Sequence, residues 1–382
     1  MRRNFMKDPE IINWKLLTDA EARESWDEML VAFADCAPFQ TYAWGEYRRA
    51  LHWEQCRWVA LNEKHETVAM MQASLRRYPV GIGLLWCEGG PVGDLSVCDD
   101  RLQTAIKSTT GLKRVYCRFR CDRTKNIEDS LRLTAQGWTL PWSPLTTCYS
   151  MQLDVAKEDD QLLAAFDRNW KRNLMRSREN NREATQWLDA GAEEVFSVYD
   201  SMQNVKGLDE QLSREEIGEM LTNLRQNLVF YRCTNDRGEI ASLLGCLVIG
   251  DRACCVLSAT SEAGRGLNSS YAVFWAMFRH LRRIGVKWLD LAGIDPIRNH
   301  GVYRFKRATG AIPIEYLGEW DWASQPAMRW FGNWAIERRD LLKRASAVLS
   351  TTRTVIKLPA RTVAVGVRTV LSFLAAVLPS ID

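Results

Sequence analysis

Two stretches of the chain share one alternation of apolar and polar residues. The first, WVALNEKHETVAMMQASL, starts at Trp58, and the second, YRCTNDRGEIASLLGCLV, starts at Tyr231. In each, an apolar run stops at a short polar segment and resumes directly after it, which is typical of a β-hairpin. The polar segments align as Asn62–Glu66 with Asn235–Glu239. The pattern therefore predicts two hairpins at equivalent places in two units.

The segments after each hairpin also correspond. The pattern predicts a helix and then a strand in each unit, over 101–110 and 115–119 in the first and over 269–284 and 287–291 in the second. In the second unit Asn268 and Ser269 are suitable N-cap residues, and Gly285 is a natural helix end. Hairpin, loop, helix and strand in this order resemble the core of the N-acetyltransferase (GNAT) fold.

The sequence thus predicts an α/β protein with two tandem GNAT-like domains. The expected boundaries are 1–155 for the first domain, 156–325 for the second and 326–382 for a basic helical tail. With 382 residues, 46% of them hydrophobic, the chain can fill more than one core and is unlike a disordered protein.

The cysteines and the N-terminal residues indicate the cellular compartment in which the protein is expected. The eleven cysteines are odd in number and scattered, and Cys254 and Cys255 are adjacent. We interpret them as reduced thiols without a metal site. No apolar run after MRRNFMKDPE is long enough for a signal peptide, so the chain is expected to stay in the cytoplasm. No cofactor is predicted.

Positive charge is concentrated at the C-terminal end. Residues 326–382 hold nine Arg and Lys against three acidic residues, whereas the whole chain has a net charge of +4. The remaining residues therefore sum to about −2. This excludes a broadly basic nucleic-acid-binding domain and restricts any such contact to a local surface or the tail.

One internal segment, LLAAFDRNWKRNLMRSRENNR, reads as a basic amphipathic helix. Its apolar stripe consists of Leu163, Phe166, Trp170 and Leu174. The basic residues fall on the other side: Arg168, Lys171, Arg172, Arg176, Arg178 and Arg182. Arg172 and Arg176 lie four residues apart, so their guanidinium groups could clamp a phosphate or diphosphate. A solvated basic face is the alternative interpretation.

Four motifs together resemble the FemABX peptidyltransferases. FQTYAWGEYRRALHW resembles the opening Gln–Trp–Lys segment of that family, and EGGPVGD its Arg-Gly-Pro turn. NWKRNLMRS resembles the start of its second domain, and GVKWLDLAGIDP with GVYRFKRATGA its closing signature. The resemblance implies tandem GNAT domains and transfer of an amino acid from aminoacyl-tRNA to a nucleotide- or lipid-linked muropeptide.

The resemblance also implies roles for individual residues. Arg48, four positions after Trp44 in the opening motif, would contact the diphosphate of the acceptor, as would Arg172 and Arg176. Phe305 and Lys306 match the Phe-Lys pair of the family, whose lysine stabilises charge during acyl transfer. The other predicted substrate-binding residues are Trp44 and Tyr303. From their place in the sequence, Asp290 and Asp295 flank Gly293 at a strand end, and either could accept the amine proton, with Asp290 preferred and His300 as another candidate base. From the residue pattern, Lys306 is expected on a short strand that enters a turn.

Several positions depart from the family pattern. Arg48 replaces a lysine, Arg176 stands where some members have a tyrosine, and no tyrosine is present at Leu257 or Ser258. The long helical-hairpin insertion of some tRNA-binding members is absent. These differences leave the acceptor open.

Two other functions remain as alternatives. An acyl-CoA-dependent N-acyltransferase would need a glycine-rich loop at a helix start to hold pyrophosphate, and GRGLNS at 264–269 has few glycines in register. A non-catalytic module that binds nucleotide-sugar or tRNA is the second alternative.

The tail has two interpretations. Residues 353–381 are apolar but interrupted by basic residues, and their longest charge-free run is too short to span a bilayer. The segment could lie on an anionic membrane, at its inner face, or pack as a helix onto the body.

Overall fold

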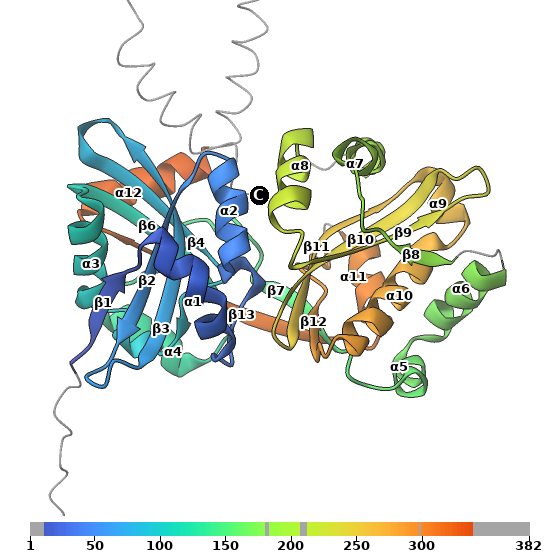
Figure 1. Cartoon of the computed structure of the whole chain (residues 1–382), viewed down its shortest axis with the longest axis horizontal. Helices are drawn as coiled ribbons and strands as arrows, with labels where there is room; N and C mark the ends of the chain where they lie inside the picture. Colours follow the sequence, from blue (N-terminus) through green and yellow to red (C-terminus); the bar gives the residue numbers. More distant parts are fainter. Residues whose placement is uncertain (1–10, 180–182, 207–211, 298, 339–382) are drawn as a thin grey trace, which may run out of the picture.

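A single continuous sheet links the two halves of the protein. The computed structural model describes residues 11–179, 183–206, 212–297 and 299–338. Within them the strands form a 13-stranded sheet in the order β1-β2-β3-β4-β6-β13-β7-β12-β11-β10-β9-β8, with β5 paired to β3 (Figure 1). The α/β class predicted from the sequence is confirmed. Residues 339–382, including the predicted membrane segment 353–381, lie outside the described part.

The two halves share a core succession of a hairpin, a third strand, a helix, a parallel strand and a last helix, to which each half adds other elements. The first half consists of β1 (Asn13–Leu16), α1 (Asp19–Val31), α2 (Tyr42–Ala50), β2 (Glu54–Leu61), β3 (Thr67–Tyr78), β4 (Ile82–Glu88), β5 (Val92–Gly93), α3 (Asp100–Thr110), β6 (Arg114–Thr124) and α4 (Ile127–Ala135). The second half consists of β7 (Tyr149–Asp154), α5 (Asp159–Ala165), α6 (Arg168–Glu179), β8 (Ala184–Gln186), α7 (Ala192–Lys206), α8 (Arg214–Asn223), β9 (Leu228–Thr234), β10 (Ile240–Ile249), β11 (Arg252–Thr260), α9 (Glu262–Gly266), α10 (Ser269–Arg283), β12 (Trp288–Asp290) and α11 (His300–Arg307). The chain then returns through β13 (Ile312–Ala323) and α12 (Pro326–Glu337) to the first half.

The two predicted hairpins are β2–β3 and β9–β10, and their turns share the same pair of side-chain-to-backbone hydrogen bonds. The side-chain oxygen of Asn62 accepts hydrogen bonds from the backbone N–H groups of Lys64 and Glu66. Asn235 makes the same pair of bonds to Arg237 and Glu239. An Asn that bonds to the backbone ahead of it fixes a tight turn, so the shared local sequence produces the shared geometry.

β13 joins the halves because it pairs with a different strand along each part of its length. Ile312–Glu315 pair antiparallel with β7, and Tyr316–Ala323 pair antiparallel with β6. The register shifts between Tyr316 and Gly318, where Gly318 has φ +76°. Only glycine adopts this conformation without strain, so the residue marks the point at which the strand changes partner.

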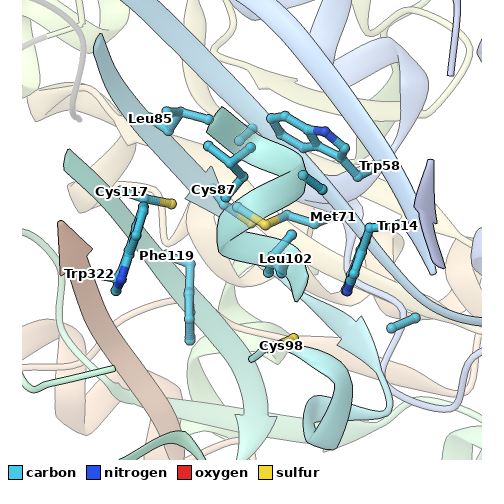
Figure 2. Close-up of a cluster of buried hydrophobic side chains, with 14 of the residues drawn as sticks. Trp14, Trp58, Met71, Leu85, Cys87, Cys98, Leu102, Cys117, Phe119 and Trp322 are labelled. Carbon is cyan, nitrogen blue, oxygen red and sulfur yellow. The ribbon is translucent and has the colours of Figure 1, made fainter. Parts of the chain in front are cut away.

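Separate apolar clusters cover the two faces of the sheet. One cluster in the first half lies between the sheet and α3 and includes Trp14, Trp58 and Phe119 (Figure 2). In the second half, one cluster gathers α5, α6 and α10, and another gathers α7 and α8 against the opposite face. A further cluster joins the halves, because Trp44 and Trp86 of the first pack with Met220 and Leu247 of the second.

A buried polar network holds α12 against β6 and β13. The guanidinium group of Arg118 donates to Glu319 at 3.1 Å and to Asn333 at 3.0 Å. Asp321, which is fully buried, accepts from Tyr116 at 3.0 Å, from Asn333 at 2.7 Å and from Arg329 at 2.8 Å. Buried charges are stable only when paired and hydrogen-bonded, and these are.

Two further observations concern the described residues alone. None of their helices is both long and apolar enough to cross a membrane. All eleven cysteines are free thiols.

Candidate active site

The parallel strands of the two halves differ in how far they stay paired. In the first half, Ile82–Glu88 of β4 pair with Arg114–Arg120 of β6 along the whole strand. In the second half, β11 pairs with β12 only from Arg252 to Cys254, although β11 continues to Thr260. The strands separate beyond this point and leave a cleft of about 570 Å³.

Four elements enclose the cleft. β11 forms one wall, the chain after β12 together with α11 forms another, and α7 and the start of α10 close the remaining sides. Its lining residues are Tyr199, Met202, Gln203, Leu212, Cys255, Val256, Leu257, Ser258, Thr260, Arg265, Ser270, Phe274, Leu291, Ala292, Asn299, Gly301, Val302, Phe305 and Lys306. This described lining contains two cations, Arg265 and Lys306, and no carboxylate. The cleft therefore favours a substrate that is anionic or develops negative charge.

Lys306 lies on a helix, so the expectation of a strand was wrong. α11 spans His300–Arg307, and Val302, Phe305 and Lys306 reach the cleft at helical spacing. Only 9% of Lys306 is exposed, and its ammonium donates to the carbonyl oxygens of Ala292 at 3.0 Å and Gly293 at 2.8 Å. These bonds fix one positive charge at the point where the strands have separated.

Asp290 faces the other side of the sheet. Successive strand residues alternate between faces, so Leu291 lines the cleft while Asp290 lines a smaller cavity with Asp122 and Tyr316. Its carboxylate accepts hydrogen bonds from the hydroxyl groups of Ser150 and Tyr316. Burial raises the pKa of Asp290 above its ordinary value, against the effect of these bonds.

Asp290 is connected to Lys306 through the backbone of one residue, Ala292. Its carboxylate accepts from the backbone N–H of Ala292 at 2.6 Å, and the carbonyl of Ala292 accepts from Lys306. Ala292 has φ +64°, a left-handed conformation that needs such support in a residue other than glycine. Asp290 is therefore placed to orient the carbonyl that holds the ammonium, and its role as a proton acceptor remains a prediction.

Phe305 belongs to an aromatic cluster beneath the cleft. Its ring centroid lies 4.9 Å from that of Phe274, 5.1 Å from Tyr271 and 6.0 Å from Trp170. The half-buried Tyr303 accepts a hydrogen bond of 3.3 Å from Arg307. Phe305 therefore lines the cleft and anchors α11, whereas the charge of the Phe-Lys pair is that of Lys306.

The predicted basic helix is two helices. α5 ends at Ala165, Phe166 is extended, and Asp167 accepts a hydrogen bond from the backbone N–H of Asn169 at the start of α6. An Asp in this position caps a helix, which explains the break. The apolar stripe is confirmed as buried at Phe166 and Trp170, with Leu163 half-buried.

The arginines of α6 lie on the surface beside the aromatic cluster. Arg172 and Arg176 are exposed, and within the described residues neither forms an ion pair. Trp170, on the buried side of the same helix, contacts Tyr271 and Phe305. The basic face is thus attached to the wall of the cleft, although Arg172 and Arg176 do not line it. Arg182 lies outside the described residues.

Trp44 and Arg48 are in the first half, on α2. Arg48 is 2% exposed, and its guanidinium lies 5.1 Å from the ring centroid of Trp53. Trp44 is buried, and burial also raises the pKa of the Glu88 carboxyl group. α2 packs on β2, β3 and α8, whereas α6 packs on α10, so the structure does not bring Arg48 together with Arg172 and Arg176 (Figure 1).

The loop before α10 is already hydrogen-bonded within the chain. The Ser261 hydroxyl accepts from the N–H of Gly264 at 3.1 Å, and the backbone N–H groups of Arg265, Leu267 and Asn268 donate to nearby carbonyls. Asn268 occupies the N-cap position of α10, as predicted, but it has φ +57° and its side chain makes no capping hydrogen bond. A CoA pyrophosphate would need backbone N–H groups that point at it. The N–H groups named here already donate to the chain itself.

A pair of glycine variants tests why glycine occurs in this loop. A Cβ at Gly264 would lie 2.0 Å from the carbonyl oxygen of Ala241, whereas a Cβ at Gly266 meets nothing within 4 Å. We expect Gly264→Ala to lower the free energy of unfolding by about 2 kcal/mol or more, and Gly266→Ala to leave it within about 0.5 kcal/mol, in urea unfolding. Equal stability of the two variants would contradict close packing of α9 on β10 as the reason for Gly264.

Comparison with a family model identifies the second half. Residues 200–335 match the model of the FemAB family. This part of the chain is therefore similar to the FemAB family. The match includes α11 and most of the elements around the cleft, and it confirms the resemblance seen in the motifs. A comparison with curated proteins finds no match.

Solved structures share the fold over most of the chain. The crystal structure of FemX has a TM-score of 0.68 at 15% identity, covering 81% of this chain and 96% of that one. A tandem GNAT protein from the clavulanic acid biosynthesis pathway has a TM-score of 0.52 at 13% identity, covering 83% and 99%. These likenesses confirm the prediction of two GNAT-like units in tandem.

Sequence reasoning missed several residues of the cleft. Arg265 lies in the loop considered only for pyrophosphate, and Tyr199 and Gln203 lie on α7, which the hairpin pattern did not include. Alternation along β11 would have placed Cys255 and Leu257 on one face. No local signal shows that this face borders a cleft, because that depends on where β12 ends.

Proposed function

We propose that the chain is an aminoacyltransferase that moves an amino acid from aminoacyl-tRNA to an amine of a peptidoglycan precursor or related cell-envelope acceptor. The observation that carries the proposal is the placement of Lys306. Its ammonium is buried, fixed by two carbonyl groups and located at the wall of a cleft whose described lining has no carboxylate. The match of residues 200–335 to the FemAB family model and the likeness to FemX support the same class of reaction.

In the proposed reaction the acceptor amine attacks the ester carbonyl of the aminoacyl-tRNA. A C–N bond forms, the ester C–O bond breaks, and the proton lost by the amine balances the hydroxyl group restored on the terminal ribose. The carbonyl oxygen becomes an oxyanion between these events. A fixed cation in a cleft that excludes water stabilises that oxyanion more than a hydrated cation would.

The surface around the cleft supports an anionic donor. Arg172 and Arg176 on α6 and Arg304 on α11 are exposed, and within the described residues no ion pair involves them. Arginines elsewhere are commonly paired with acids, as Arg49 is with Asp19 and Arg77 with Glu54. Unpaired guanidinium groups beside a cleft are suited to phosphate groups.

The alternative CoA-dependent reaction is less well supported. The loop that would hold the pyrophosphate lies partly in α9, and the backbone N–H groups of Arg265, Leu267 and Asn268 already donate to carbonyls of the chain. We propose the cytoplasm as the place of action, because charged tRNA and nucleotide-linked precursors are both found there.

The test is an incubation of the full chain with charged tRNAs and a mixture of nucleotide- and lipid-linked muropeptides, followed by mass spectrometry. A parallel tube contains acetyl-CoA in place of tRNA. We expect a mass gain of one amino-acid residue that requires charged tRNA and is lost after ribonuclease treatment. A gain of one acetyl group would transfer the protein to the CoA-dependent class, and no gain in either tube would favour a binding module.

A further inference from the structure

An exposed aromatic patch lies on the outer side of α12, away from the cleft. We define it as Leu140, Trp142, Trp330 and Trp334. Leu140 is 62% exposed, Trp330 55% and Trp142 45%. The ring centroids of Trp142 and Trp330 are 6.3 Å apart, and those of Trp330 and Trp334 are 6.2 Å apart in a stacked arrangement. Exposed apolar side chains that gather in this way mark a docking surface more often than scattered ones do.

The aromatic patch is held rigidly by the protein beneath it. The backbone N–H of Trp142 donates to the side chain of Asn333 at 2.9 Å, and Arg329 donates to the carbonyl of Leu140 at 2.9 Å. Arg329 and Asn333 both donate to the buried Asp321. The network that anchors α12 therefore also fixes the loop that carries Trp142. Little conformational entropy remains to be lost when the patch binds a surface.

The sequence beyond the aromatic patch is basic and apolar. Residues 339–382 follow directly after Arg338, one residue past the end of α12. Seven cations occur there against two acids: Arg339, Lys343, Arg344, Arg353, Lys357, Arg361 and Arg368 against Asp340 and Asp382. Each basic residue near an anionic lipid surface contributes about 1 kcal/mol of attraction.

We propose that the aromatic patch is a membrane-docking surface that places α12 on an anionic bilayer. Tryptophan combines an apolar ring with an N–H donor, and it is enriched where proteins meet the headgroup region of a bilayer. The sequence that follows α12 is basic, and a basic segment attached to this helix is attracted to anionic lipid and repelled by an identical segment of a second copy. An anionic bilayer therefore fits the patch better than a second copy of the chain.

The experiment is co-sedimentation of the full chain with vesicles of phosphatidylcholine alone and of phosphatidylcholine with phosphatidylglycerol. We expect binding to the anionic vesicles, and an apparent Kd about tenfold weaker for Trp142→Ser/Trp330→Ser at unchanged salt. Ile127→Ser/Leu131→Ser is the matched control, because these residues of α4 are 70% and 63% exposed and lie outside the patch. The control is expected to bind like the unaltered protein.

Two results would overturn the proposal. The first is equal sedimentation of the patch variant and the unaltered protein. The second is a concentration-dependent dimer, seen by light scattering, that the patch variant abolishes, which would assign the surface to a second copy. Circular dichroism of each variant checks its fold. Vesicle binding is measured without tRNA or acceptor, so failure here is distinct from failure of the proposed transferase.

Discussion

Replacing Lys306 with methionine is expected to lower kcat by about a hundredfold or more, with a small change in KM. A positioned donor at a developing oxyanion contributes roughly 3 kcal/mol to the transition state. Methionine keeps much of the length and apolar stem of lysine but removes the charge that the carbonyl groups of Ala292 and Gly293 hold in place. Because an interaction made in the transition state is removed, kcat and kcat/KM should fall together.

Arg307→Met is the matched control, since it removes one cation from the next residue of the same helix. Arg307 is exposed and does not line the cleft, so its loss should change kcat less than threefold. Urea unfolding of both variants separates loss of catalysis from loss of fold. If Lys306→Met retained kcat, Lys306 would be a structural cap for the chain after β12, and the proposed chemistry would need another cation.

Replacing Arg118 with methionine is expected to lower the free energy of unfolding by about 3 kcal/mol. Removing one partner of a buried ion pair costs about 3 to 5 kcal/mol, since the other charge remains buried. Glu319 is only 6% exposed, and its carboxylate forms an ion pair with the guanidinium group of Arg118 at 3.1 Å. The lower end of the range applies because Glu319 also accepts hydrogen bonds from the backbone N–H groups of Leu145 and Thr146.

Urea unfolding of the Arg118 variant is compared with Arg114→Met, four residues earlier on the same strand. Arg114 is exposed, so its loss should change stability by less than about 0.5 kcal/mol. Adding Glu319→Gln to Arg118→Met should cost less than the sum of the two single changes, because the pair is coupled. Strict additivity would show that Arg118 and Glu319 do not act as a pair.

The local sequence predicted elements whose determinants lie within a few residues of one another. The hairpin turns at Asn62 and Asn235 are one example, because the side chain of each Asn bonds to the next few backbone amides. The helix that begins at Ser269 is another, since its apolar side repeats along the helix itself. The Phe-Lys pair also identified Lys306 as a residue to examine.

The same local reasoning failed where two short elements meet. α11 has eight residues and α5 has seven, so each contains too few turns for helical spacing to be distinguished from a strand or from a neighbouring helix. Lys306 was therefore expected on a strand, and α5 and α6 were expected as one helix. The break at Asp167 is clear only from the hydrogen bond that it accepts.

By itself, the sequence determined the α/β class, the two related units and the identity of the central lysine, because these follow from periodicity and from short motifs. Tertiary structure alone decided that β12 leaves β11 after Asp290, that β13 joins both halves, and that Arg48 lies apart from α6. Strand pairing depends on contacts between residues far apart in the chain, and no local pattern records where such pairing stops. The cleft beside Lys306 exists because that pairing stops early.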